Sequence, residues 1–346
     1  MFKSLKSRID KELPSFIHDI QTRYSLNNIS PLLSKSIKDF VLRDGKRIRP
    51  ILFAIGYLGY AAKAAPGLIR SALSIELLHD FMLVHDDIID KSDTRRGKPS
   101  LHTLFNKHIS RYRGIKFSGQ DLAIVAGDIM YAMAIDAFLS IKVGMRYKEK
   151  ALKKFIAAAV NTGAGEFIEL LGGLKDIRDI RLKDIYKVYD YKTASYTFAT
   201  PLATGAILAG APQNQTDNLY SYGICLGRAF QIKDDLLGIF GDEKKTGKST
   251  LTDLQEAKKT LLIWHAYSNS GNKVRKTIHN ILSRKTVSKK DLCRMRKIIT
   301  ETGSLEFTKR EILRLVKKSE AIISNTSMKR NYMEALLSWS DKLLNH

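Results

Sequence analysis

The chain has 346 residues, 44% of them hydrophobic and 27% charged, and it carries a formal net charge of +23. This composition is typical of a globular protein and excludes an intrinsically disordered chain. The two cysteines, Cys225 and Cys293, exclude a disulfide scaffold and a four-cysteine metal site, as expected in a reducing compartment. No continuous apolar run approaches the roughly 18 residues that span a bilayer. The N-terminus also lacks the apolar core of a secretory signal, so we expect a cytoplasmic protein.

The positive charge is concentrated near the C-terminus. Residues 268–346 contain 18 Lys and Arg against 7 Asp and Glu, a net charge of +11. Nucleic acid, an anionic membrane surface and a polyphosphate substrate are the natural counter-charges, and a solvated basic surface is the plain alternative. A single-stranded nucleic-acid interface needs aromatic side chains among its cations, and this stretch has only Phe307, Tyr332 and Trp339. We therefore expect no nucleic-acid partner.

Long apolar stretches between glycine and proline residues predict a nearly all-helical chain with almost no strand. Several stretches are apolar most of the way round, as in the inner helices of a layered fold. We predict a single large all-α domain over residues 1–346, with a motif-bearing core at about 44–262 and a basic helical part at 268–346. The main helices are expected at residues 69–89, 122–145, 150–171, 183–209, 218–240 and 251–267.

The N-terminal segment carries Phe2, Leu5, Ile9, Leu13 and Phe16 at helical spacing. This pattern predicts a helix whose apolar face packs on the domain's own core. A weak peripheral contact with a membrane surface is the alternative, because basic amphipathic helices also bind lipid headgroups.

The first cluster of cations is the segment DGKRIRP, which begins at Asp44 and directly precedes an apolar stretch. Lys46, Arg47 and Arg49 crowd around Gly45. Taken alone, this segment would be a solvated turn or a patch for nucleic acid. Beside the acidic motifs that follow, we interpret it as a pocket for an anion.

The segment ELLHDFMLVHDDIIDKSDTRRGKPS places acids inside an apolar helical stretch. Asp86 and Asp90 share a helix face, about 40° apart, and His79 lies about 20° from Asp86. Two carboxylates in apolar surroundings repel unless a cation lies between them. Their hard oxygens favour Mg²⁺, which commonly bridges to phosphate, and Arg95 and Arg96 match phosphate as well. An acidic helix end at the surface is the plain alternative.

A second acidic pair, Asp234 and Asp235, follows another apolar helical stretch, with Gln231 one turn before Asp235. Upstream, Lys192 and Thr193 place a cation and a hydroxyl in a helical stretch, which alone is a weak signal. Facing each other across a cavity, the two acidic motifs would hold several Mg²⁺ ions around one diphosphate.

These clusters, in this order, resemble the motifs of the trans-isoprenyl diphosphate synthase (polyprenyl synthetase) family, and most closely its archaeal-type geranylgeranyl diphosphate synthases. The resemblance covers about residues 44–262. It implies an all-α fold around a deep cavity, usually as a homodimer, with about three Mg²⁺ per active site. It also implies the head-to-tail condensation of isopentenyl diphosphate with an allylic diphosphate. The matching segments are GKRIRP, HDFMLVHDDIIDKSDTRRG, GEFIEL, KTAS, FQIKDDLLG and GKSTLTDLQEAKKTLL.

The resemblance implies a role for each residue that matches a family motif. The metal ligands would be Asp86 and Asp90 with Asp87 in support, and Asp234 with Asp235 near it. The isopentenyl diphosphate pocket would consist of Gly45, Lys46, Arg49, His79 and Arg96. The leaving pyrophosphate would be neutralised by Arg95, Lys192, Lys248 and Lys258. The allylic cation would be stabilised by the oxygen dipoles of Thr193 and Gln231.

Two features bear on the product. The second acidic motif reads DDLLG, with Gly238 at the position of a third acid, which leaves the ligands of the third Mg²⁺ open. Phe81, five residues before Asp86, resembles the aromatic floor of enzymes that make C20 products. Helix geometry alone would select Met82, which lies closer to the face of Asp86. We expect geranylgeranyl diphosphate, with farnesyl diphosphate (C15) or a C15/C20 mixture as the alternative.

Three other functions compete with this interpretation. A non-catalytic regulatory subunit of a heteromeric prenyl synthase would have lost acidic motifs, and both leading pairs are present. A terpene cyclase would share the first motif but has no use for an isopentenyl pocket such as the one that GKRIRP, His79 and Arg96 would form. A nucleic-acid-binding helical protein would need more aromatic residues among its cations.

Overall fold

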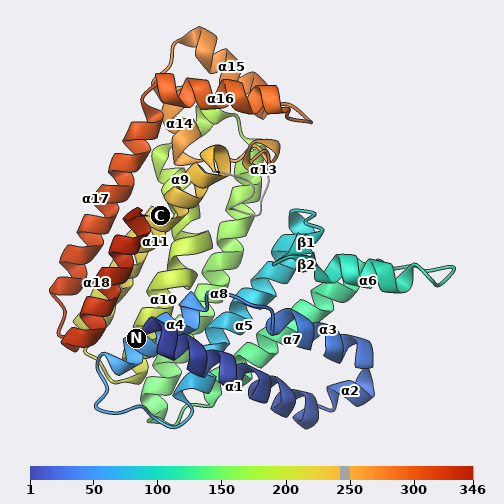
Figure 1. Ribbon diagram of the computed structural model, residues 1–346, viewed down its shortest axis with the longest axis vertical. Coiled ribbons are helices and arrows are strands. Elements are labelled where there is room, and N and C mark those ends of the chain that lie inside the picture. Colours follow the sequence, from blue (N-terminus) through green and yellow to red (C-terminus); the bar gives the residue numbers. More distant parts are fainter. Residues whose placement is uncertain (242–249, 346) are drawn as a thin grey trace. The chain divides into compact units, whose positions relative to one another are not determined.

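The computed structural model describes residues 1–241 and 250–345, which form two compact units. Unit 1 contains residues 1–155 and 204–211, and unit 2 contains residues 156–203 and 212–346. Each unit is described by itself, and the prediction of a single domain stays a prediction. Four of the six main helices expected from the sequence occur near their expected ranges, and Figure 1 shows the observed elements. The only strands in the described residues form one short hairpin.

Unit 1 is built around α5, which was expected at residues 69–89. Leu73, Ile75, Leu77 and Leu78 of this helix are fully buried, so it is an inner helix, as its apolar sequence predicts. It packs against α1, α4, α6 and α7. The elements of the unit are α1 (Phe2–Arg23), α2 (Leu26–Ile29), α3 (Pro31–Val41), α4 (Ile48–Leu58), α5 (Leu68–Ile89), β1 (Thr94–Arg95), β2 (Lys98–Pro99), α6 (Leu101–Ile109), α7 (Gly119–Leu139) and the start of α8 (Met145–Leu174).

The apolar face of α1 packs into unit 1. Leu5, Ile9, Leu13 and Phe16 are all buried, which confirms the expectation that this face packs on the protein's own core. α7 is long and apolar enough to cross a membrane by length and composition, but the core helix of a soluble protein passes the same test. Less than half of the apolar stretch of α7 is buried.

Unit 2 is built around α11, which packs against the π-helical segment η2 and against α17. Gly223 and Gly227 make this packing close, since a Cβ at either position would lie within 2.5 Å of the backbone of Ala199 or Ala194. The elements are the rest of α8, η1 (Ile177–Asp179), α9 (Leu182–Val188), η2 (Tyr189–Ala199), the start of α10 (Thr200–Leu208), whose end belongs to unit 1, α11 (Gln213–Phe240), α13 (Thr252–Gln255), α14 (Leu261–Ser268), α15 (Asn272–Leu282), α16 (Lys289–Glu301), α17 (Ser304–Ser324) and α18 (Arg330–Asn345).

Two expected helices differ from the structure. The stretch 183–209 is α9, the π-helical segment and α10 rather than one α-helix. The expected helix 251–267 is interrupted, because Ala257 adopts a left-handed backbone conformation (φ +51°) and Thr260 caps a new helix by accepting a hydrogen bond from the Ile263 amide. Hydrophobic periodicity does not detect such a break, because both pieces are apolar on the same side.

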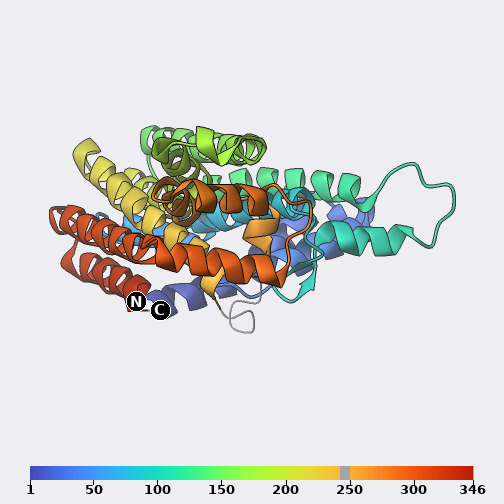
Figure 2. The same cartoon turned by 90° about the horizontal axis from the view of Figure 1, so that it is seen from above.

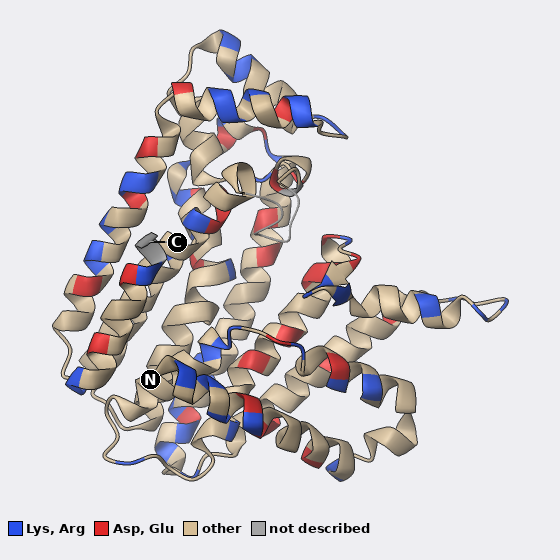
Figure 3. Ribbon diagram, in the orientation of Figure 1, with Lys and Arg blue, Asp and Glu red and all other residues tan. Residues whose placement is uncertain are grey.

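The basic C-terminal helices carry acids among their cations. Figure 3 shows Lys and Arg along α15, α16 and α17, with Asp and Glu among them on α16 and α17. Several of these cations form ion pairs, such as Arg284 with Asp291 and Arg314 with Glu311. The seam of α17 and α18 is visible from above in Figure 2, where the two helices run side by side.

Candidate active site

The first acidic motif lies at the C-terminal end of α5. Asp86 is about one quarter exposed, and Asp90 is the capping residue of the helix, whose amide donates to the Asp86 carbonyl at 2.8 Å. Asp87, on a different face, is only 1% exposed. The helical period thus presents Asp86 and Asp90 on one side and sends Asp87 into the protein.

Asp87 is bound by an arginine of the hairpin that follows α5. Arg95 Nε donates to Asp87 Oδ1 at 2.7 Å, and Nη2 of the same side chain also contacts this oxygen and lies 3.6 Å from Asp86 Oδ2. Burial raises the pKa of Asp87 and the Arg95 guanidinium opposes that rise. Arg95 therefore places one cation beside both leading acids of the motif.

The hairpin itself is held by the end of α3. Arg43 donates to the carbonyls of Arg95 (3.1 Å) and Pro99 (3.0 Å), and Lys98 donates to Asp39 at 2.6 Å. The hairpin turn gives Arg96 a left-handed backbone conformation (φ +53°). Each of these contacts joins residues that are more than 50 positions apart in sequence. Together they fix the orientation of the hairpin that carries Arg95 and Arg96.

Arg96, in the turn of the hairpin, lies beside the GKRIRP segment. The position of a Cβ on Gly45 would lie 3.6 Å from the Arg96 guanidinium carbon, so the two predicted pocket residues are neighbours. Arg49 and Arg96 are near enough to His79 to lower its pKa further, after burial as the main cause. Lys46 is exposed. Four of the five predicted isopentenyl diphosphate residues, Gly45, Arg49, His79 and Arg96, are thereby linked within unit 1.

Phe81 lies one turn before His85 on α5. Its ring is 4.6 Å from the His85 ring and 5.2 Å from the ring of Tyr131 on α7, measured between centroids. Phe81 and Met82 are both half-buried. A close approach of α7 allows this stack, because a Cβ at Gly127 would lie 2.6 Å from His85. Tyr131 was not a sequence candidate, since nothing in its local pattern separates it from a core aromatic.

The second acidic motif lies near the C-terminal end of α11 in unit 2. Asp234 is exposed, whereas Asp235 is buried. Asp235 accepts hydrogen bonds from the Tyr189 hydroxyl and, at 2.8 Å, from the Gln231 amide. Burial raises the pKa of Asp235 to about 7 against the effect of these hydrogen bonds.

The other predicted residues of unit 2 join the same network. Thr193 donates to Gln231 Oε1 at 2.7 Å, from the π-helical segment, a kind of helix that often occurs at functional sites. Lys192 forms ion pairs with Glu166 (2.7 Å) and Glu169 of α8. Lys248 lies outside the described residues.

The structure answers part of the question that Gly238 raised. A Cβ at this position would lie 2.0 Å from Oδ2 of Asp253, so the Asp253 carboxylate occupies the space where a third acid of the motif would begin. Asp253 also contacts Lys258 at 3.4 Å. Burial raises the pKa of Asp253, as does the nearby Asp234. Asp253 was missed because it lies 15 residues beyond the motif.

Lys258 is the cation of this group. Burial alone would lower its pKa, and the Asp253, Glu169 and Glu256 carboxylates more than offset that effect, so the pKa lies above its ordinary value. Lys258 is therefore charged at any neutral pH and able to bind an anion.

The donors of both motifs fit a hard cation such as Mg²⁺, because they are carboxylates with at least one accessible member in each pair. Within residues 1–241 and 250–345, no three His, Cys, Asp or Glu side chains form a metal site by themselves.

One cavity of unit 1 lies away from these motifs. It has a volume of about 760 Å³ and is lined by Arg8, Glu12, Arg23 and Arg70 beside Gly67, at the opposite end of α5 from Asp86. Its arginines are mostly engaged by acids, as in the pair of Arg70 with Glu12 at 2.8 Å. The cavity does not contain any of the predicted site residues.

Comparisons with known proteins agree with the motifs. Residues 30–299 match the polyprenyl synthetase family. The short chain isoprenyl diphosphate synthase of Methanocaldococcus jannaschii is 30% identical over 84% of this chain and 80% of that protein. The geranylgeranyl diphosphate synthase of Sulfolobus acidocaldarius is 30% identical over 81% of this chain and 80% of that protein.

A solved structure is similar over nearly the whole chain. The geranylgeranyl pyrophosphate synthase of Corynebacterium glutamicum, in complex with isoprenyl diphosphate and magnesium, has a TM-score of 0.88 at 26% identity and covers 99% of both chains. The fold is therefore the all-α fold that the sequence predicts. With its motifs, its family match and its relatives in agreement, this chain belongs to the polyprenyl synthetase family.

Proposed function

We propose that the protein is a prenyltransferase that condenses isopentenyl diphosphate with an allylic diphosphate, head to tail, into a short-chain all-trans prenyl diphosphate. Geranylgeranyl diphosphate (C20) is the main product, with farnesyl diphosphate as the alternative. One observation carries this proposal: consecutive arginines of one short hairpin reach two different groups of the same unit. Arg95 lies beside Asp86 of the acidic motif, and Arg96 lies beside Gly45 of the cationic segment. A diphosphate enzyme with two substrates needs both.

The acids serve as metal ligands. Asp86 and Asp90 would hold Mg²⁺ bound to the allylic diphosphate, and Asp234, supported by Asp235 and Asp253, would complete a set of about three ions. When bound, Mg²⁺ makes pyrophosphate a better leaving group. The buried acids Asp87 and Asp235 would support the accessible acids next to them, as residues outside the ligand shell do in many metal sites.

The cations of both units serve the leaving group. Arg95, Lys192, Lys248 and Lys258 would neutralise pyrophosphate as its charge develops. Lys192 is held by Glu166 and Glu169, which orient its ammonium group from the α8 side. Thr193 and Gln231 present oxygen dipoles that can stabilise an allylic cation.

Isopentenyl diphosphate would bind at Gly45, Lys46, Arg49, His79 and Arg96. The lowered pKa of His79 keeps its imidazole neutral at pH 7, so this residue contributes a hydrogen bond rather than a charge. The double bond of isopentenyl diphosphate attacks the allylic carbon, pyrophosphate leaves, and a proton is lost from the adduct. No side-chain nucleophile is required.

We also propose a homodimer in the cytoplasm. The C-terminal two thirds of α8 exposes a stripe of apolar side chains at three- and four-residue spacing. Such a stripe is the pattern that pairs helices across an interface, and a second copy of the chain is the occupant that fits a self-complementary face. The exposed residues are Ile156, Val160, Phe167, Leu170, Leu171 and Leu174.

The test is incubation with Mg²⁺, radiolabelled isopentenyl diphosphate and each allylic primer in turn, followed by chromatography of the products. We expect C20 as the longest abundant product. Absence of any condensation with every primer would exclude the enzyme and favour a regulatory subunit. Lys46→Ala and His79→Ala should mainly raise the KM for isopentenyl diphosphate, whereas Lys192→Ala should mainly lower kcat.

A further inference from the structure

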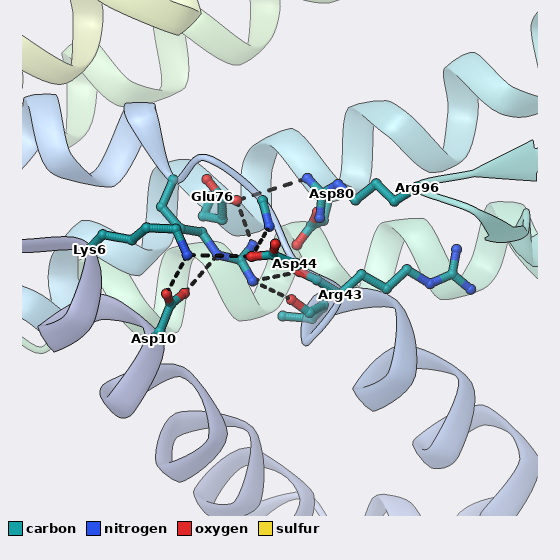
Figure 4. Close-up of polar contacts among 10 residues, drawn as sticks. Lys6, Asp10, Arg43, Asp44, Glu76, Asp80 and Arg96 are labelled. Atoms are coloured by element: carbon teal, nitrogen blue, oxygen red, sulfur yellow. Dashed lines mark hydrogen bonds and ion pairs between the residues drawn. The ribbon is translucent and has the colours of Figure 1, made fainter. Parts of the chain in front are cut away.

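Two carboxylates of α5 lie one helical turn apart beneath the cations of the isopentenyl pocket. Glu76 is 2% exposed and Asp80 is 0% exposed. Figure 4 shows them near Arg96, with Asp44 and Arg43 below Asp80 in this view and Lys6 and Asp10 of α1 at the left. Neither acid is among the residues that the motifs assign to metal or diphosphate binding. Both are buried carboxyl groups, and burying such a group is costly unless it has a partner.

Glu76 holds the loop that carries the pocket. Arg47 Nη1 donates to Glu76 Oε1 at 2.7 Å, Nη2 donates to the Arg43 carbonyl at 2.7 Å, and Nε donates to Asp10 of α1 at 3.2 Å. Arg47 has a left-handed backbone conformation (φ +51°), which is uncommon outside glycine. A buried, multiply bonded guanidinium supports that conformation, and Arg47 lies between Lys46 and Arg49 in the chain.

The same loop is tied to α1 a second time. Lys6 pairs with Asp10 at 2.7 Å and with Asp44 at 3.4 Å, and Asp44 accepts a hydrogen bond from the Gly45 amide at 2.8 Å. These outer contacts are exposed and contribute little by themselves. The contact between Arg47 and Glu76 is the buried one, so it carries most of the positioning of this loop.

Asp80 is placed differently. No group within residues 1–241 or 250–345 donates a hydrogen bond to either of its buried carboxylate oxygens. The nearest cation of the hairpin is Arg96, whose Nη1 lies 3.7 Å from Asp80 Oδ1, too far for a hydrogen bond. That nitrogen also has no hydrogen-bond partner. Asp80 therefore attracts Arg96 without binding it.

We propose that these two acids act on the isopentenyl diphosphate pocket in opposite directions: Glu76 positions the cationic loop through Arg47, and Asp80 competes with the diphosphate for Arg96. Both are positioning residues, and the inference rests on the proposed function. A bound diphosphate draws Arg96 toward itself, and a charged Asp80 resists that shift. Glu76 Oε1 also lies 4.0 Å from Arg96 Nη2, but its contact with Arg47 at 2.7 Å is the closer one. The pocket thus has one acid that mainly builds it and one that weakens it.

The competition depends on pH. Burial, and next the Glu76 carboxylate, raise the pKa of Asp80 to about 8, while Arg96, Arg47 and Arg49 act against that rise. His79 also faces this region but stays neutral, because its own pKa is lowered. Asp80 is accordingly protonated below about pH 8 and charged above it. The affinity for isopentenyl diphosphate should therefore fall as the pH rises through this value.

The test is a matched pair of variants, Glu76→Gln and Asp80→Asn, each of which removes one negative charge and keeps the side-chain shape. The KM for isopentenyl diphosphate is measured at pH 7 and pH 9 with saturating allylic primer. Glu76→Gln should raise this KM about tenfold or more at both pH values. Asp80→Asn should lower it severalfold at pH 9 and remove most of its pH dependence. The KM for the primer should stay near the wild-type value in both.

Two controls make the result decisive. Glu12→Gln removes a charge from the same unit, at a carboxylate that pairs with Arg70 and not with a pocket residue, and should leave the KM for isopentenyl diphosphate as it is. Arg47→Lys retains the charge but not the three contacts, so it should behave like Glu76→Gln even if that variant folds poorly. Circular dichroism and thermal unfolding verify that each variant is folded, and calorimetric titration with isopentenyl diphosphate measures binding without turnover.

A change of KM in the same direction for Glu76→Gln and Asp80→Asn would overturn the proposal in favour of a simple charge effect. Lowered stability with an unchanged KM in both would overturn it in favour of a purely structural pair. An inactive wild-type protein would instead reject the proposed function. Normal product formation with unaffected variants would reject this inference alone.

Discussion

In unit 1 the buried member of the acidic pair, Asp87, is bound by an arginine, whereas in unit 2 the corresponding Asp235 is bound by a tyrosine hydroxyl and an amide. Both motifs consist of two aspartates after an apolar helical stretch. Only in the first is the buried aspartate bound by a charged side chain. The accessible acids, Asp86 and Asp234, are therefore the equivalent ones, whereas the buried acids beside them have different partners.

The largest loss of turnover is expected at the accessible acid of each motif, the feature that the two units share. Asp86→Ala and Asp234→Ala should each lower turnover at least ~10²-fold, on the order of 3 kcal/mol of transition-state stabilisation. Folding should be retained, because removing one of two crowded carboxylates relieves repulsion in the metal-free protein. Steady-state kinetics at saturating Mg²⁺ measure this loss. Near-normal turnover of either variant would break the equivalence of the two motifs.

The next effect concerns the third acid of the second motif. Gly238→Asp restores the family pattern in sequence, but its Cβ would lie 2.0 Å from Asp253 Oδ2 and displace that carboxylate. We expect turnover to fall by about tenfold or more and the Mg²⁺ concentration for half-maximal rate to rise. Gly238→Ala is the control, since it adds the clash without a carboxylate. A lower Mg²⁺ concentration for half-maximal rate in Gly238→Asp would show instead that the second motif simply lacks a third metal ligand.

The supports of the two pairs should differ in stability. Asp87→Asn leaves the mostly buried Arg95 without its carboxylate and should cost about 3 kcal/mol of unfolding free energy. Asp235→Asn keeps an oxygen that can accept from Tyr189, and should cost less than about 1 kcal/mol. Chemical denaturation of the metal-free protein at pH 7 gives both values. Equal losses would mean that the charge on Arg95 does not matter to the fold.

A change of product with little loss of rate is expected at Phe81, which belongs to the first region alone. Phe81→Ala removes the ring that packs on Tyr131 and His85, and a longer prenyl tail gains roughly 0.8 kcal/mol for each CH₂ that fills the space. The variant should therefore make C25 and longer products. Met82→Ala should lengthen them less. Product chromatography distinguishes this result from an unchanged C20 product, which would leave Phe81 as a core residue only.

The sequence alone determined the features that depend on local periodicity. The helical period places Asp86 and Asp90 on one face and turns Asp87 inward, and the apolar character of α5 makes it an inner helix. The order and spacing of the motifs identified the family. Each of these features follows from a residue pattern within a short stretch of chain. It can therefore be predicted without knowing what that stretch packs against.

Only the tertiary structure decided how the charged groups are paired. Asp253 fills the space beside Gly238, Glu76 holds Arg47 across 29 residues of sequence, and Arg43 fixes the hairpin of Arg95 across 52. The sequence also did not predict the left-handed backbone of Arg47 and Arg96 or the π-helical segment. A residue other than glycine adopts a left-handed conformation only when surrounding contacts support it. Buried charges choose partners by geometry and desolvation, which the folded chain sets and its local pattern does not.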